Sequence, residues 1–269
     1  MIDPDAPAPG EIYRDPVYDG ATDPTVVRDG TGGWWMFSTQ RRANHPDAGT
    51  LEPDASGLSL SADGPPAHVD ATHWAPEVIH DGTGWRMFLT EIEGVPSQWD
   101  GHPRHIVEYV SDDLIHWRRL RPLVLASDRV IDAAVAVSDD LTSWELDGTA
   151  IGGRAHEGPY VFSLGGAWWM LTDEWRGMAV HRSDDAVTWT RQGGPDDVIL
   201  GEYRPEESGV QIGRHGAVIV LEREARLYYF THPWWDGSEL AEAAEPHHRR
   251  SAVHVARLSV EADRLVCAR

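Results

Sequence analysis

Two short repeated units constrain the fold of this chain more than any other feature of its sequence. The first places Pro before an apolar pair, a Gly-containing turn and an aromatic-rich strand. Its copies are DPTVVRDGTGGWWMFST (23–39), APEVIHDGTGWRMFLT (75–90), GPYVFSLGGAWWMLT (158–172) and, more loosely, RHGAVIVLEREARLYYFT (214–231). The second unit, S-D-D-x-x-x-W, occupies 111–117, 138–144 and 183–189. Short apolar runs separated by Asp- and Gly-rich turns predict an all-β chain.

The spacing of the second unit predicts a β-propeller. A degenerate copy begins at Ser61, 50 residues before Ser111, and Ser138 and Ser183 are 45 residues apart. Repeats of roughly 40–50 residues, each with about four strands, are typical of propeller blades. The 269 residues therefore predict one domain, 1–269, folded as a five-bladed β-propeller. The alternative is a β-sandwich with incidental Asp-Gly turns, and three near-copies of one motif argue against it.

The third blade is predicted to be shortened. Ser111 and Ser138 lie only 27 residues apart, and the run IDAAVAVSDD (131–140) passes directly from a predicted innermost strand into the second unit. Either the blade has lost its middle strands, or the sequence omits a segment. The well-kept motifs on both sides favour the omission. A true loss would expose neighbouring strand edges, to which a partner chain or an aggregate can add.

Charge and composition exclude several classes of function. The chain has 23 basic and 44 acidic residues, a formal charge of −21, which repels phosphate backbones and anionic membranes. We therefore expect neither a nucleic-acid nor a membrane partner. Lysine is absent, which excludes Schiff-base and P-loop lysine chemistry. The single cysteine, Cys267, excludes an internal disulfide and a cysteine-based zinc site.

The N-terminal residues carry neither the basic nor the apolar region of a secretory signal, so the expected location is cytoplasmic. No apolar run approaches the ~18 residues of a membrane span. The oligomeric state stays open.

Ionisable residues recur at equivalent places in the predicted innermost strands, which converge on the axis of a propeller. Asp23 lies one place before the Pro of its copy, and Asp132 fits the same slot. Glu157 lies two places before the Pro, Glu77 directly follows it, and His215 opens the last copy. An Asp-Pro pair alone is a common turn opening. Like charges gathered together are costly unless a substrate, a cation or protonation relieves them, so the set as a whole indicates acid–base chemistry.

These motifs, in this order, resemble glycoside hydrolase family 43 and, more widely, the five-bladed propeller glycosidases. The resemblance is carried by DPTVVRDG, HWAPEV, RVIDA, AHEGPYVFSLGGAWWML and GRHG, and it spans roughly residues 18–265. It implies that Asp23 is the general base and Glu157 the general acid. It also implies that Asp132 tunes the pKa of the acid and orients it.

The resemblance also implies the surroundings of these three residues. Trp74 and Glu77 would contribute to the sugar-binding wall. His215 would lie at the axis, beside a bound structural cation (calcium or sodium) or its water shell, and no other cofactor is required. Further residues near the predicted ends of inner strands are candidates for contacts with sugar hydroxyls: Gln40, Arg41, Arg104, His105, Trp175, Arg176, Arg204 and His232.

The sequence therefore predicts a glycoside hydrolase that acts on a small oligosaccharide or glycoside. The expected mechanism is inverting, which requires Asp23 to be ionised and Glu157 to be protonated. Two alternatives stay open. A sugar-binding propeller without catalysis is favoured by the short third blade. A glycoside phosphorylase on the same fold requires arginines that bind phosphate, for which the candidates are Arg41, Arg42, Arg104 and Arg176.

Overall fold

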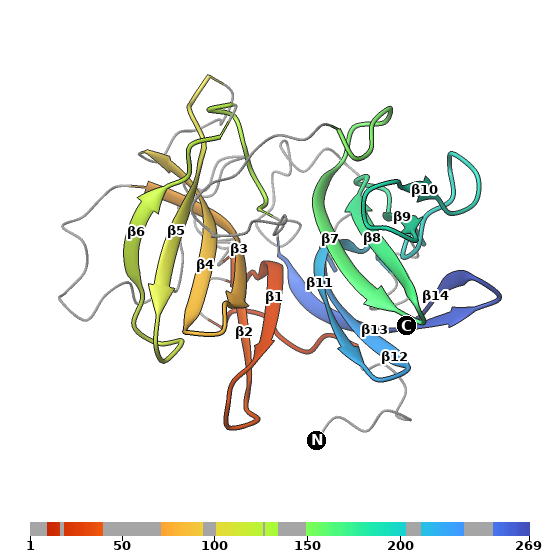
Figure 1. Ribbon diagram of the computed structural model, residues 1–269, viewed down its shortest axis with the longest axis horizontal. Coiled ribbons are helices and arrows are strands. Elements are labelled where there is room, and N and C mark those ends of the chain that lie inside the picture. The colour runs from red at the N-terminus through yellow and green to blue at the C-terminus, as the bar shows by residue number, and fades with distance from the viewer. Residues whose placement is uncertain are drawn as a thin grey trace.

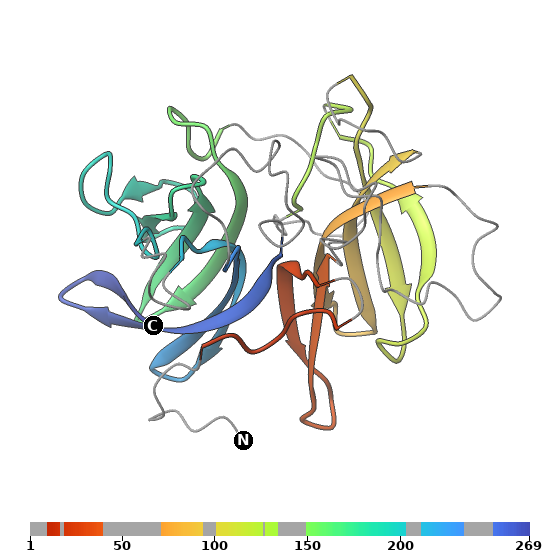
Figure 2. The same ribbon diagram turned by 180° about the vertical axis from the view of Figure 1, so that it is seen from behind.

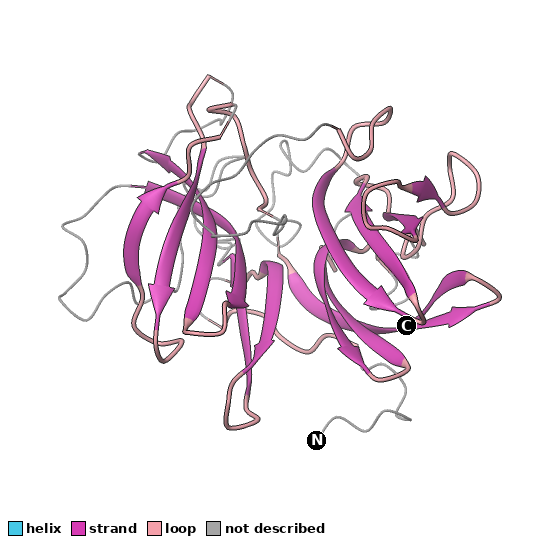
Figure 3. Ribbon diagram, viewed as in Figure 1, coloured by secondary structure: helices cyan, strands magenta, loops and turns pink. Residues whose placement is uncertain are grey.

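The structure is a computed structural model, and it describes residues 10–16, 19–39, 71–93, 101–125, 127–133, 149–202, 211–233 and 250–269. Within these residues every regular element is a β-strand (Figure 3). The prediction of an all-β chain is therefore confirmed for the described part. No helix in that part could cross a membrane.

The strands form four antiparallel sheets, each joined in chain order, as in the blades of a propeller. One sheet has two strands, β1 (Thr22–Arg28) and β2 (Trp34–Thr39). The next contains β3 (Ala71–His80), β4 (Trp85–Glu93), β5 (His105–Ser111) and β6 (Arg118–Pro122). Another contains β7 (Glu157–Leu164), β8 (Ala167–Asp173), β9 (Met178–Ser183) and β10 (Thr190–Arg191). The last contains β11 (Arg214–Leu221), β12 (Glu224–Thr231), β13 (Ala252–Glu261) and β14 (Arg264–Ala268).

The sequence repeats form the same turns in different sheets. In the first unit, Asp29 and Asp81 accept hydrogen bonds from backbone N–H groups of the residues that follow them, between the first and second strands. In the second unit, Asp113 and Asp185 do the same between the third and fourth strands. A short carboxylate that satisfies turn N–H groups explains why Asp recurs at these places.

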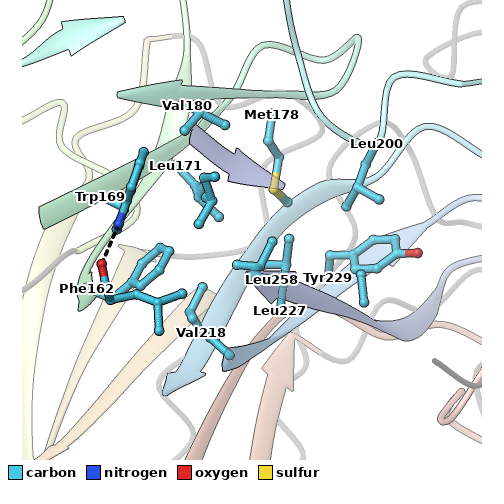
Figure 4. Close-up of a cluster of buried hydrophobic side chains, with 14 of the residues drawn as sticks. Phe162, Trp169, Leu171, Met178, Val180, Leu200, Val218, Leu227, Tyr229 and Leu258 are labelled. Atoms are coloured by element: carbon cyan, nitrogen blue, oxygen red, sulfur yellow. Dashed lines mark hydrogen bonds between the residues drawn. The ribbon is translucent and has the colours of Figure 1, made fainter. Parts of the chain in front are cut away.

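Neighbouring sheets pack face to face, and each interface has its own hydrophobic core. Between the β1–β2 and β3–β6 sheets, Trp117 of the second unit is 1% exposed and meets the ring of Phe37 edge to face at 5.8 Å. Val26 and Tyr228 share the core between the β1–β2 and β11–β14 sheets. The core around Trp169 joins the β7–β10 and β11–β14 sheets (Figure 4). Each fully buried large apolar side chain contributes about 1.5–3 kcal/mol to stability.

The order of the sheets follows from contacts between their first strands. β1 contacts β3 on one side and β11 on the other, and β11 contacts β7. The sheets thus form an arc in the order β3–β6, β1–β2, β11–β14 and β7–β10 (Figures 1 and 2). The third blade is predicted between the two ends of this arc, and residues 134–148 lie outside the described residues. The count of five blades, the shortened blade and the single domain therefore stay predictions.

Candidate active site

The first strand of each sheet breaks register with its neighbour at one equivalent place. The shifts lie between Thr22 and Thr25, Trp74 and Glu77, Glu157 and Tyr160, and Arg214 and Gly216. The first three contain a left-handed residue before the Pro of the repeat: Asp23 (φ 49°), Ala75 (φ 45°) and Gly158 (φ 54°). Proline is tolerated at a bulge because no ladder N–H is needed there. Bulges re-aim side chains and are common beside active sites.

Asp23, Asp132 and His215 meet at this level, although they come from three distant parts of the chain. Nδ1 of His215 lies 3.4 Å from Oδ1 of Asp23 and 3.9 Å from Oδ2 of Asp132. The side chains of His215, Asp23 and Asp132 are 16%, 19% and 10% exposed, respectively. The structure therefore brings together the two aspartates and the histidine that the repeat alignment predicted to converge.

Hydrogen bonds that run from one sheet to the next hold the backbone of Asp132, of His215 and of the β3 bulge. A bulge or loop N–H donates to a side chain near the end of a second strand in the neighbouring sheet. The pairs are Ala75 N to Oγ1 of Thr39 at 2.9 Å, Asp132 N to Oγ1 of Thr90 at 3.1 Å, and His215 N to Oδ2 of Asp173 at 3.2 Å. Asp132, which also has a left-handed φ of 54°, is thus anchored to the β3–β6 sheet.

Position 158, in the Glu-Gly-Pro motif, requires glycine because the imidazole of His215 lies very close to it. A Cβ atom on this residue would lie 2.6 Å from Cγ of His215, and its φ of 54° disfavours other residues. Its backbone N–H also donates to the carboxyl group of Asp132. The motif therefore lets the imidazole of His215 pack directly against the backbone that follows Glu157.

Glu157 begins β7 in an acidic environment. Its Oε1 accepts a 2.8 Å hydrogen bond from Nε1 of Trp175, a residue that is 42% exposed. Burial raises the pKa of Glu157 to about 8, and the negative charges of Asp132 and Asp173 add to this effect. Glu157 thus carries a proton at neutral pH, which is the state that a general acid needs.

Asp23 is half-buried, and its partners reverse the effect of burial on its pKa. Burial raises its pKa, while the hydrogen bond and charge of His215 outweigh this and hold the pKa below its usual value. Oγ1 of Thr22 also donates to Oδ2 of Asp23 at 2.9 Å. Burial lowers the pKa of His215, and Asp23 and Asp132 overcome that effect and raise it to about 10. Asp23 is therefore an ionised carboxylate beside an imidazolium.

Asp132 and Glu77 complete the ionisable groups around His215. Burial is the main cause that raises the pKa of Asp132 to about 6, opposed by His215 and reinforced by Asp23. Burial likewise raises the pKa of Glu77 to about 8. Oε2 of Glu77 accepts a 3.3 Å hydrogen bond from Oγ1 of Thr25.

The other predicted sugar-contact residues are more scattered. Trp74 is half-buried just before the β3 bulge, and His105 is exposed at the start of β5. Arg104 is buried, and its backbone N–H donates to the carbonyl of Asp128. Gln40, Arg41 and Arg204 lie outside the described residues.

Arg176 and His232 are engaged in structural contacts. Nη2 of Arg176 lies 2.6 Å from Oε2 of Glu174, and Nη1 donates to the carbonyl of Asp196 at 2.7 Å. His232 is 3% exposed, and its Nδ1 lies 2.9 Å from the carbonyl oxygen of Arg250.

Asp173 belongs to the site, although no sequence motif singles it out. It is 1% exposed and is the cross-strand partner of Glu157. All four copies of the first unit end on Thr, and Asp173 follows the last Thr of its copy by one place. An acidic residue at the end of this apolar strand was the available signal.

The described part of the chain contains no set of side chains arranged to bind the predicted axial cation. No group of three or more His, Cys, Asp and Glu side chains there is arranged to hold a metal ion. A metal-binding imidazole must be neutral, whereas Asp23 and Asp132 keep His215 protonated. The calcium or sodium ion therefore stays a prediction, and no chemical step below depends on it.

Comparison of the sequence with models of protein families and with curated proteins finds no match. Solved structures do match. A thermostable family-43 glycoside hydrolase has 16% identity and a TM-score of 0.61, covering 95% of this chain and 96% of that one. A family-43 β-xylosidase/α-arabinofuranosidase from a compost microbial metagenome, in complex with xylotriose, has 11% identity and a TM-score of 0.61, covering 96% and 98%. A family-43 β-1,3-galactosidase has 13% identity and a TM-score of 0.64, covering 97% and 61%. The fold of this chain is therefore that of the family-43 glycoside hydrolases.

Proposed function

We propose that this protein is a glycoside hydrolase in which Asp23 is the general base and Glu157 the general acid. One observation carries the proposal: two half-buried carboxyl groups lie around His215, in surroundings that shift their pKa values in opposite directions. Hydrolysis of a glycosidic bond needs this combination, because the leaving oxygen must gain a proton while a water molecule loses one.

In the proposed reaction, Glu157 gives its proton to the glycosidic oxygen as the bond to the anomeric carbon breaks. Asp23 takes a proton from a water molecule, whose oxygen bonds to that carbon from the opposite face. The products are two sugars, with Glu157 ionised and Asp23 protonated, and exchange with solvent restores both groups. The pattern of three acidic residues resembles that of inverting enzymes, which supports inversion of the anomeric configuration.

His215 and Asp132 support the two proton transfers without exchanging protons with the substrate. The imidazolium of His215 favours the ionised form of Asp23 before each turnover. The charge of Asp132 favours the protonated form of Glu157. The exposed indole of Trp175, tied to Glu157, offers an apolar face of the kind on which sugar rings stack.

The proposed substrate is a small oligosaccharide or glycoside. Two of the structural neighbours are a β-xylosidase/α-arabinofuranosidase and a β-1,3-galactosidase, so xylosides, arabinofuranosides and galactosides are the first candidates.

A sugar-binding protein without catalysis is less well supported. Blocking of the site would require Asp23 or Glu157 to be paired with arginine, and in the described part of the chain neither forms such a pair. Asp23 is paired with His215, and Glu157 is hydrogen-bonded to Trp175. A phosphorylase would require free arginines at the site, whereas Arg176 is engaged by Glu174.

The test is a panel of nitrophenyl xylosides, arabinofuranosides and galactosides assayed with the wild type and with Glu157→Gln. Asp184→Asn is the matched control, because Asp184 is an exposed carboxylate on the same sheet. We expect hydrolysis by the wild type and by Asp184→Asn, and a strong loss in Glu157→Gln. Sugar binding without hydrolysis of any glycoside would refute the proposal. NMR of the first-formed product tests inversion separately, since a retained anomer would indicate a covalent nucleophile.

A further inference from the structure

Two carboxyl groups stand opposite each other in one strand pair at the site. Glu157 is the first residue of β7, Asp173 is the last residue of β8, and the two are direct cross-strand partners. Asp173 is 1% exposed. Two ionised carboxyl groups directly opposite each other would destabilise a sheet, so this arrangement is tolerated only if one of them holds a proton. The pair is therefore a feature that stability alone does not explain.

Both oxygens of Asp173 hold backbone groups of residues that contact the proposed acid and base. Oδ1 accepts a 2.7 Å hydrogen bond from the N–H of Trp175, whose indole donates to Glu157. Oδ2 accepts a 3.2 Å hydrogen bond from the N–H of His215, whose imidazole pairs with Asp23. Trp175 has a left-handed φ of 57°, which costs free energy and needs such an anchor.

We propose that Asp173 is a positioning residue that serves both halves of the site. It holds the indole of Trp175 against the acid Glu157 and the imidazolium of His215 against the base Asp23. The inference rests on the proposed function for the roles of Glu157 and Asp23.

The charge of Asp173 also acts on Glu157. The ionisable groups that act on Glu157 are Asp132 from the loop after β6, Asp173 from β8, His215 from β11 and Asp23 from β1. Burial raises the pKa of Asp173 itself, opposed first by the charge of Arg214. Removal of the Asp173 charge should lower the pKa of Glu157, so that the acid loses its proton at a lower pH.

The experiment compares pH profiles of kcat/KM for the wild type, Asp173→Asn and Asp173→Thr on a glycoside with a poor leaving group. The alkaline limb of this profile reports the ionisation of the acid in the free enzyme. We expect the limb to move to lower pH in both variants. Thr stands at comparable places in two other sheets, where Thr39 and Thr90 accept backbone N–H groups. Asp173→Thr should therefore retain a higher maximal rate than Asp173→Asn.

Glu174→Gln is the matched control. Glu174 is the next residue, is also buried, and already has its charge balanced by Arg176 and Arg191. Its substitution should lower stability without moving the alkaline limb. If the limb stays in place in the Asp173 variants, or moves equally in Glu174→Gln, the inference is wrong.

A second measurement separates this inference from the proposed function. NMR titration of the ¹³C-labelled Glu157 carboxyl group requires no activity. A lower pKa of Glu157 in Asp173→Thr than in the wild type supports the coupling even if no glycoside is hydrolysed. An unchanged pKa refutes the coupling even in an active enzyme.

Discussion

The Asp23 half and the Glu157 half of the site have the same kind of backbone and opposite chemistry. Both carboxyl groups come from the first strand of a sheet, at or beside its bulge, and burial raises the pKa of both. Asp23 faces an imidazolium and two hydroxyl groups, so its pKa falls below the usual value. Glu157 faces two carboxyl groups that add to the effect of burial, and its pKa rises to about 8. Burial acts in the same direction on both residues, so the charges of their neighbours set the role of each.

Removal of the base Asp23 should cause the largest loss of activity. Asp23→Asn should lower kcat by about 10²–10⁴-fold, the usual contribution of one acid–base group, because the amide cannot accept a proton from water. Sugar binding should persist, since the base contacts the attacking water rather than the substrate. Steady-state kinetics and calorimetric titration with the product sugar test both points. Retention of most activity would remove Asp23 from the mechanism.

Removal of the acid should give a loss that depends on the leaving group. Glu157→Gln should lower the rate on alkyl glycosides by about 10²–10⁴-fold, because the leaving oxygen then departs without a proton. Dinitrophenyl glycosides need no such proton and should be hydrolysed much closer to the wild-type rate. Rates across a series of leaving groups provide the measurement. Equal losses on good and poor leaving groups would contradict the acid role of Glu157.

Substitution of His215 should move the acid limb of the pH profile to higher pH, and the alkaline limb as well, because the same cation also lowers the pKa of Glu157. His215→Asn removes the cation that lowers the pKa of Asp23, so the base becomes protonated at a higher pH. At a pH below the limb, a tenfold increase in the proton affinity of Asp23 reduces the rate about tenfold. The pH dependence of kcat/KM measures this, with His116→Asn as the control, because His116 lies on an exposed turn. An acid limb unchanged from the wild type would separate Asp23 from His215.

The smallest expected effect is on stability as a function of pH. Glu77, Asp132 and Glu157 have raised pKa values of about 8, 6 and 8, so the folded protein holds protons that the unfolded chain releases above about pH 4–5. The stabilisation from His215, with a pKa of about 10, is complete below its ordinary value of 6.5 and is lost as pH rises through 10. Stability should therefore fall from pH 7 to pH 9, a range in which the buried His181 and His254, whose pKa values are lowered, no longer oppose the trend.

Thermal unfolding at constant ionic strength tests this prediction. The midpoint should decrease across that range, and the double variant Glu77→Gln with Glu157→Gln should show a flatter curve. A midpoint that rises with pH between 7 and 9 would mean that these carboxyl groups are ionised in the folded protein.

Much of the fold could be predicted from the sequence, because the motifs that form its turns involve residues close together in the chain. Asp29, Asp81, Asp113 and Asp185 form their turns with residues at most four places away. The repeats also predicted that Asp23, Asp132 and His215 meet, because equivalent strands of a propeller share one axis. The structure does not test the predicted count of five blades, because residues 134–148, in the predicted third blade, lie outside the described part of the structure.

The sequence by itself thus determined the β-strands, their turns and the set of acidic residues that face one centre. The family resemblance implied which of them carries a proton, but only the tertiary structure supplied the physical reason. The pairing of Asp23 with His215 spans 192 positions, and that of His215 with Asp173 spans 42. The alternation of residues within one strand does not predict which residues so far away in the sequence will contact it. The pKa of a group in such a site depends on charges a few ångströms away in space, and in this fold those charges come from strands and loops that are far apart in the sequence.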